Sequence, residues 1–417
     1  RPRFQIHDQR ILGIACHQCF APNSLQRLTR RSAVTDKYLI AQCFYAHSTQ
    51  ILANAAAVLG KREEEAEYSA LEQKIKDAFV KEYMTPGGRL VSGTQTAYVL
   101  ALHFDMLPEN LRDQAAKRLA DNVRSYGNHL TTGFLGTPYL CHVLTRFGYN
   151  DLSYKLLEQQ TYPSWLYPVK MGATTIWERW DGIKPDSSFE TPSMNSYNHY
   201  SYGAIGDWMY RVMVGLDTYE DGPGYKHIKV QPYIGGSFTE ASARLITYYG
   251  TLAAGWKILS GKILFDVEIP ANTRATIYVP AKSAADITES GKPVMGSTDL
   301  KLAGIVDGYV LVQVGSGNYH FEITTDSSAN APLRLDDYVG KYKVEGGMIE
   351  SIQIKLEGGK LSAVVFNNSG ELDSVKNGKE QFLSSNGSAV NFFRDASGKV
   401  TKIKMEALGM SFEGRKE

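Results

Sequence analysis

The most constraining feature of this sequence is a change in the spacing of its apolar residues near position 220. Before that position, stretches that are apolar on nearly every side alternate with stretches that carry a single apolar stripe. After it, apolar and polar residues alternate one by one, which is the period of a half-buried β-strand. Helices and strands bury their apolar faces in separate layers. The sequence therefore predicts a helical region followed by all-β regions.

The helical region repeats one pattern. Residues 36–59 are apolar on nearly every side and stop at Gly60, which is typical of a fully buried helix. Residues 62–83 are charged except for one apolar stripe, as expected of a half-exposed outer helix. The same pairing recurs in residues 96–104 with the helix after Pro108, and in residues 137–147 with residues 151–160.

Alternating buried and half-exposed helices predict helical hairpins in two concentric layers, an α/α toroid whose inner helices line a cavity. A closed toroid of six hairpins needs about a dozen helices. Only about seven or eight are predicted before Asp217. We therefore expect a partial toroid in residues 35–225, with some apolar surface of its inner helices left exposed.

The β-regions follow from strict alternation. Phe265, Val267 and Ile269 alternate with polar neighbours, and similar runs with Gly-rich turns predict a β-sandwich in residues 226–324. Residues 325–332 have the composition of a linker. Beyond it, further alternating runs and Gly-containing turns predict a small second β-domain in residues 333–417.

Composition excludes several classes of function. The formal net charge is +1, so no concentrated basic face for nucleic acid is expected. No apolar run has the roughly 18 residues that a membrane span needs, and no signal-peptide pattern is readable. We therefore expect neither a nucleic-acid nor a membrane partner. Localisation stays open, and a secreted or periplasmic parent protein is one option.

Residues 1–34 differ from the rest of the chain. They contain six Arg and no Lys and show no sustained period, so they are predicted to be an atypical leader, either disordered or misread. Cys16 and Cys19 have the spacing of half a zinc site, but no second pair of ligands follows. No metal and no cofactor are expected.

The stretch 174–182 places Glu178 between Trp177 and Trp180. A carboxylate beside aromatic surface is costly unless it is paired or used, and apolar walls raise a carboxyl pKa towards the range of proton transfer. The alternative is that Glu178 forms an ordinary ion pair with Arg179. The chain has 25 Tyr, and its five Trp fall between residues 165 and 256. Such density indicates a platform for sugars or a large core.

Two further polar clusters accompany this carboxylate. One contains Asn195, Asn198 and His199, and the other has His129 beside a Gly-rich turn. Amide, imidazole and hydroxyl groups beside aromatic rings match the hydrogen bonds and the apolar face that a sugar requires. For the first cluster the alternative is helix capping by Asn198 or Ser201.

Five segments together resemble one family. The segments are TDKYLIA (35–41), HLTTGFLGTPYL (129–140), GATTIWERWDG (172–182), MNSYNHYSYGAIGDWMYRVMVGL (194–216) and YKHIKVQP (225–232). Over residues 35–323 the chain is similar to the C-terminal half of a bacterial α-L-rhamnosidase of glycoside hydrolase family 78. The resemblance implies an (α/α)6 barrel followed by a β-sandwich, and hydrolysis of terminal α-L-rhamnosyl groups from glycosides or polysaccharides with inversion.

The resemblance also implies roles. Glu178 matches the family's general base, which activates water, and His199 matches a histidine of the sugar subsite. An inverting glycosidase needs this base and a separate protonated acid. Together with the polar clusters, the resemblance gives a set of predicted substrate-binding residues: His199, Trp177, Trp180, Asp181, Asn195, Asn198 and His129.

The chain departs from the family in lacking the block that carries the general acid, which lies some hundreds of residues before the base. We therefore expect a truncated product, a partial (α/α)6 barrel whose activity on its own is open. The alternative function is a non-catalytic carbohydrate-binding fragment, and a polysaccharide lyase is a third reading. Residues 333–417 faintly resemble small β-barrel modules of bacterial hydrolases. The particular rhamnoside and the oligomeric state are not readable from the sequence.

Overall fold

The structure is a computed structural model. It describes residues 35–417 except 191, 193–194, 299, 326–334, 345–348, 367, 375–379, 386, 396–398 and 408–409. The predicted leader, its cysteine pair and nearly all of the predicted linker lie outside the described residues. The chain divides into two compact units, one reaching to Glu220 and including Ile228–Phe238, the other formed by Asp221–His227 and Thr239–Glu417.

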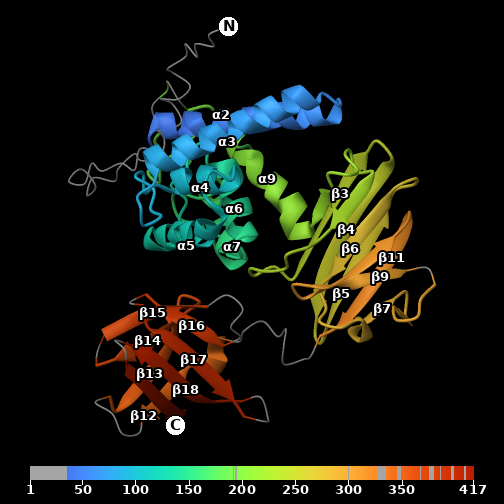
Figure 1. The fold of residues 1–417 in the computed structure, drawn as a ribbon. Helices are drawn as coiled ribbons and strands as arrows, with labels where there is room; N and C mark the ends of the chain where they lie inside the picture. The colour runs from blue at the N-terminus through green and yellow to red at the C-terminus, as the bar shows by residue number, and fades with distance from the viewer. Residues whose placement is uncertain are drawn as a thin grey trace. The chain divides into compact units, whose positions relative to one another are not determined.

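The first unit is built from helical hairpins (Figure 1). Asp36 caps the helix that begins at Lys37, because its carboxylate accepts hydrogen bonds from the backbone N–H groups of Tyr38 and Leu39. Thr94 caps the helix that begins at Gln95, where its hydroxyl accepts from the N–H of Ala97. Successive helices pair as α2 (Lys37–Val58) with α3 (Arg62–Tyr83), α4 (Gln95–His103) with α5 (Glu109–Ser125), and α6 (Thr137–Arg146) with α7 (Asn150–Leu157).

The inner helices α2 and α4 differ in burial, although both sequences are apolar all round. In α4 every residue from Gln95 to Leu102 is buried. In α2 one side is buried, whereas Tyr38, Tyr45 and Leu52 are 65%, 52% and 49% exposed. These three lie seven residues apart and so share one face. The prediction that this helix is fully buried is therefore wrong, and the expected exposure of inner-helix surface is found here.

The remaining elements of the helical unit are short. Gly215 adopts a φ of 90°, and a Cβ there would lie 2.2 Å from the carbonyl carbon of Gln231, so glycine is required where the chain leaves the last helix. Tyr154 donates a hydrogen bond of 2.7 Å to the carbonyl of Tyr233. The remaining elements are α8 (Leu166–Lys170), η3 (Ser201–Ala204), α9 (Ile205–Trp208), η4 (Met209–Val214), and the antiparallel pair β1 (Leu216–Thr218) and β2 (His227–Val230).

The β-sandwich has the alternation that the sequence predicts. In β5, Phe265, Val267 and Ile269 are buried. One sheet has the order β3-β4-β5-β11-β7-β8, and β6, β10 and β9 lie side by side in the other. The elements are β3 (Glu240–Thr247), β4 (Gly250–Leu259), β5 (Lys262–Ile269), β6 (Arg274–Val279), η5 (Ala284–Asp286), β7 (Ile287–Glu289), β8 (Lys292–Pro293), β9 (Lys301–Val306), β10 (Tyr309–Val314) and β11 (Gly317–Thr324).

The C-terminal residues form a closed, antiparallel barrel in which each strand pairs with the next and β12 closes on β19 (Figure 1, orange to red). The predicted fold class, a partial (α/α)6 barrel with a β-sandwich and a small β-barrel, is confirmed. The elements are η6 (Leu335–Tyr338), β12 (Gly340–Val344), β13 (Ser351–Glu357), β14 (Lys360–Val365), β15 (Asn368–Ser374), β16 (Gln381–Ser384), β17 (Ala389–Arg394), β18 (Val400–Ala407) and β19 (Met410–Lys416).

Candidate active site

Two segments of the helical unit lie side by side and bring Glu178 close to the backbone that carries His199. The backbone N–H of Glu178 donates to the carbonyl of Ser196 at 2.8 Å, and that of His199 donates to the carbonyl of Ile176 at 2.8 Å. The hydroxyl of Thr175 donates to the carbonyl of Tyr197. The two segments that the sequence analysis singled out, 174–182 and 195–199, are thus joined by their backbones.

The carboxylate of Glu178 is held by this backbone pairing. Its Oε2 accepts a hydrogen bond of 2.9 Å from the N–H of Ser196, and the residue is partly exposed. No basic side chain in the described part of the chain pairs with it. The alternative in which Glu178 forms an ion pair with Arg179 is therefore wrong.

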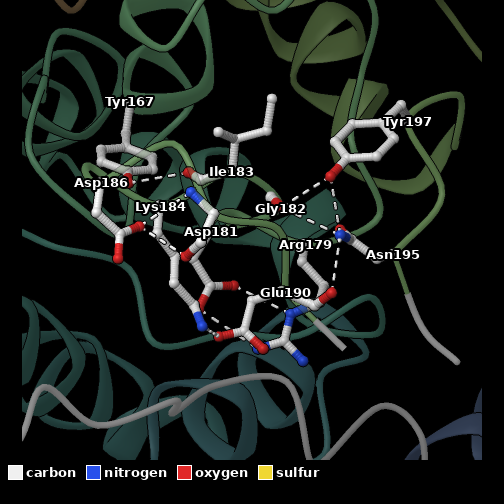
Figure 2. A network of polar contacts seen from close by, with 11 residues as sticks. Tyr167, Arg179, Asp181, Gly182, Ile183, Lys184, Asp186, Glu190, Asn195 and Tyr197 are labelled. Atoms are coloured by element: carbon white, nitrogen blue, oxygen red, sulfur yellow. Dashed lines mark hydrogen bonds and ion pairs between the residues drawn. The ribbon is translucent and has the colours of Figure 1, made fainter. Parts of the chain in front are cut away.

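Arg179 instead neutralises two other carboxylates of the same loop (Figure 2). Its Nε lies 3.0 Å from Oδ1 of Asp181, and its Nη2 lies 4.0 Å from Oε2 of Glu190. Lys184 adds a contact of 2.7 Å to Glu190. Burial opposes the charge of Arg179, but the hydrogen bond and the charge of Asp181 outweigh it and raise the pKa of the guanidinium. In this structure Asp181 is therefore the ion-pair partner of Arg179.

Asn195 and Tyr197 hold the other side of the loop through Gly182, as Figure 2 shows. The side-chain N–H of Asn195 and the hydroxyl of Tyr197 both donate to the carbonyl of Gly182, at 3.1 and 2.8 Å. A Cβ at Gly182 would lie 2.8 Å from Oδ1 of Asn195 and 3.1 Å from the ring of Trp177. A side chain at Gly182 would thus require the side chains around it to shift.

The two tryptophans beside Glu178 are buried. Trp177 is 4% exposed and meets Tyr197 edge to face with ring centroids 5.3 Å apart. Trp180 is 5% exposed and stacks on Tyr202 with ring centroids 3.8 Å apart. Both rings contribute mainly to packing under the loop. Their predicted contact with a sugar stays a prediction.

His199 lies between two aromatic rings. Its imidazole stacks on Phe134 with ring centroids 4.8 Å apart and on Tyr200 with ring centroids 5.3 Å apart. Nδ1 accepts a hydrogen bond of 3.3 Å from the backbone N–H of Ser201, so in the neutral ring the proton resides on Nε2. Phe134 was not among the predicted site residues, although it lies in the Gly-rich turn that follows His129.

The remaining predicted residues have structural surroundings. Both ring nitrogens of His129 contact protein groups, Nδ1 the carbonyl of Tyr126 at 2.9 Å and Nε2 the hydroxyl of Thr161 at 2.8 Å. Asn198 is exposed. The helical turn η3 begins without a side-chain cap, so the alternative in which Asn198 or Ser201 caps it is wrong.

Within the described ranges, no group of three His, Cys, Asp or Glu side chains is arranged to hold a metal ion. Over the same ranges, no helix combines the length and the apolar character that crossing a membrane requires.

Comparison with protein families identifies three matched regions. Residues 24–213 match the bacterial α-L-rhamnosidase 6 hairpin glycosidase domain, and residues 215–293 match the bacterial α-L-rhamnosidase C-terminal domain. The first match begins inside the segment 1–34 that the sequence analysis set apart. Residues 324–417 match a domain of unknown function, DUF3471.

Individual relatives agree with these matches. Over 289 residues, 69% of the chain, it is 38% identical to an α-L-rhamnosidase of Streptomyces avermitilis and 40% identical to one of Formosa agariphila. The crystal structure of the Streptomyces avermitilis α-L-rhamnosidase complexed with L-rhamnose superposes with a TM-score of 0.66 at 37% identity, covering 76% of this chain and 30% of that one. The chain spans only 27% and 31% of the length of the two curated relatives.

Proposed function

We propose a function from one premise: residues 24–293 of this chain belong to the bacterial α-L-rhamnosidase family. The helical unit carries part of the active site of a glycosidase that hydrolyses terminal α-L-rhamnosyl groups with inversion at the anomeric carbon. In this part Glu178 is the general base and His199 contacts the sugar. The general acid comes from a segment of the parent barrel outside residues 35–225.

The observation that supports this proposal most is the state of the Glu178 carboxylate. Asp181 and Glu190 are neutralised by basic side chains, whereas Glu178 accepts one backbone N–H and keeps its charge uncompensated by any basic side chain among the described residues. A carboxylate that is fixed in orientation and not neutralised can accept a proton from water. The fixed orientation reduces the reorganisation needed at the moment of reaction.

The proposed reaction follows from these groups. Glu178 takes a proton from a water molecule, and the water oxygen bonds to the anomeric carbon as the glycosidic C–O bond breaks. The acid, about 6.5 to 9.5 Å from the base, protonates the leaving oxygen. The charge of Glu178 also favours the oxocarbenium character of the transition state. The N–H on Nε2 of His199 donates to a sugar hydroxyl.

A chimera tests the proposal. Residues 35–324 replace the aligned segment of the Streptomyces avermitilis α-L-rhamnosidase, so that this chain supplies only its own part of the site. We expect the chimera to hydrolyse 4-nitrophenyl α-L-rhamnoside and Glu178→Gln to lower kcat by about 10²- to 10⁴-fold, the typical contribution of a general base.

The matched control is Glu67→Gln, the same substitution at an exposed position of α3, which should leave kcat unchanged. Turnover that survives Glu178→Gln would remove Glu178 from the role of base. If the unmodified chimera folds and binds L-rhamnose without turning over the substrate, the alternative of a non-catalytic carbohydrate-binding fragment replaces the proposal.

A further inference from the structure

The C-terminal barrel has two unlike ends. Consecutive turns of an antiparallel barrel alternate between its ends. The turn η6 precedes β12 at one end, and the hydroxyl of Tyr338 in this turn donates to Oε1 of Glu380 at 3.1 Å. Arg394 joins the carboxylates of Glu380 and Asp337, and Nζ of Lys416 donates to the carbonyl of Asp337 at 2.6 Å. This network closes that end of the barrel.

Aromatic rings fill the interior next to the closed end. Phe392 lies 4.6 Å from Tyr338, 5.5 Å from Phe382 and 5.8 Å from Tyr342, measured between ring centroids. All four rings are buried. Burial raises the pKa of Tyr338 to about 12, so its hydroxyl stays protonated and able to donate. These rings therefore pack against one another in the part of the barrel next to this end.

The opposite end of the barrel holds a cavity of about 430 Å³. Its described lining comes from strands β14, β15, β16, β18 and β19 and from residues next to them, and includes Ile349, Val365, Met405, Met410 and Phe412. Phe366, also in the lining, is 67% exposed, and Met410 is 43% exposed, so the cavity reaches solvent at this end. Among the described residues no Asp, Glu, Lys, Arg or His lines it.

Size and lining define what the cavity can hold. Sites for small organic ligands typically measure about 300 to 1,000 Å³ and are lined by apolar side chains with a few polar groups. An eight-stranded barrel is just wide enough to enclose one such ligand. Here Ser384 and Asn368 supply a hydroxyl and an amide, whereas Met405 and Met410 can adapt to irregular shapes. A charged ligand would lose its hydration and find no side chain of opposite charge among the described lining residues.

We propose that the open end of the barrel of residues 335–417 is a binding site for a small, uncharged and largely apolar molecule. The inference does not depend on the proposed glycosidase activity, because it rests on a different domain. Densely packed interiors seldom contain voids much larger than a water molecule. A cavity of this volume beside a tightly filled half of the same barrel is therefore a feature of the fold, and the ligand removes its apolar lining from water.

Adjacent positions on β14 provide a matched test. Val365 lines the cavity, whereas Val364 points to the other face of the strand because side chains alternate. N-phenyl-1-naphthylamine, a neutral apolar dye, is titrated into the full chain and its fluorescence followed. The unmodified chain and Val364→Trp should bind it saturably with similar Kd, and Val365→Trp should weaken binding at least tenfold.

Equal binding by all three proteins, or no saturable binding by the unmodified chain, would overturn the proposal. Because the apolar face of α2 can also adsorb dye, only binding that responds to Val365→Trp counts in its favour. If circular dichroism shows that Val365→Trp does not fold, Ala407→Leu, a smaller filling of the same cavity, takes its place with the same expected loss.

Competition tests the chemical class. Decanol should displace the dye at a concentration at least tenfold below that of decanoate or decylammonium, since none of the lining residues that the structure describes would neutralise either charge. Equal displacement by the charged and uncharged compounds would contradict an uncharged ligand.

Discussion

Two arginines, in two regions of the molecule, each hold two carboxylates, and the surroundings of these groups differ. In the loop of the helical unit, Arg179, Asp181 and Glu190 are only 12 to 14% exposed, and a third carboxylate, Glu178, remains outside the network. In the barrel, Arg394, Asp337 and Glu380 are 27%, 37% and 16% exposed. Within the loop of the helical unit, the ion pairs thus distinguish Asp181 and Glu190 from Glu178, the candidate catalytic carboxylate, a distinction that composition does not make.

The substitution Arg179→Met should cause the largest loss of stability. Without the guanidinium, Asp181 loses the cation that pairs with it, whereas Glu190 keeps its contact with Lys184. Removing one partner of a buried ion pair costs about 3 to 5 kcal/mol. Because these groups are partly exposed, the expected loss of stability is at the lower end, about 3 kcal/mol. Hydrogen exchange of amides in residues 176–199 measures it locally. Arg62→Met, on the exposed face of α3, is the control and should change nothing.

The substitution Arg394→Met should have a smaller effect, because the network of the barrel is more exposed. We expect it to lower the stability by about 1 to 2 kcal/mol. Hydrogen exchange of β16 and β17 reports this loss. Dye binding at the other end should be unchanged. A loss larger than that of Arg179→Met would show that burial does not rank the two networks, and a loss of dye binding would show that the two ends of the barrel are not independent.

The smallest expected effect concerns pH. Burial, followed by the nearby His142 and His47, lowers the pKa of His103 to about 4 from its usual 6.5. Below pH 6.5 the unfolded chain therefore binds a proton that the folded chain does not, so the free energy of unfolding falls as the pH drops from about 6.5 towards 4. Because His103 is partly exposed, we expect the free energy of unfolding to fall by about 1 kcal/mol over this pH range.

His103→Gln should remove this part of the acid sensitivity when the free energy of unfolding is compared between pH 7.5 and pH 5. His320→Gln is the control, because His320 lies on the β-sandwich with its side chain 64% exposed. Equal acid sensitivity of the unmodified chain and the His103 variant would contradict the assigned cause.

Much of the fold could be predicted from the sequence, because hydrophobic period reports which face of an element is buried. The hydrophobic period could not distinguish α2 from α4, since both helices are apolar all round and the period does not show which surfaces other elements cover. The backbone pairing of residues 175–178 with residues 196–199 depends on tertiary contacts that spacing does not encode. The aromatic neighbour Phe134 and the hollow half of the barrel likewise emerge only when distant segments are assembled.

The stereochemistry of the first-formed product tests the central claim most directly. ¹H NMR of the chimera during hydrolysis of 4-nitrophenyl α-L-rhamnoside distinguishes the two anomers of rhamnose before they equilibrate. If Glu178 directs water to the anomeric carbon as a general base, β-L-rhamnose forms first. If α-L-rhamnose forms first, the reaction proceeds with retention, and Glu178 is not the base of an inverting glycosidase.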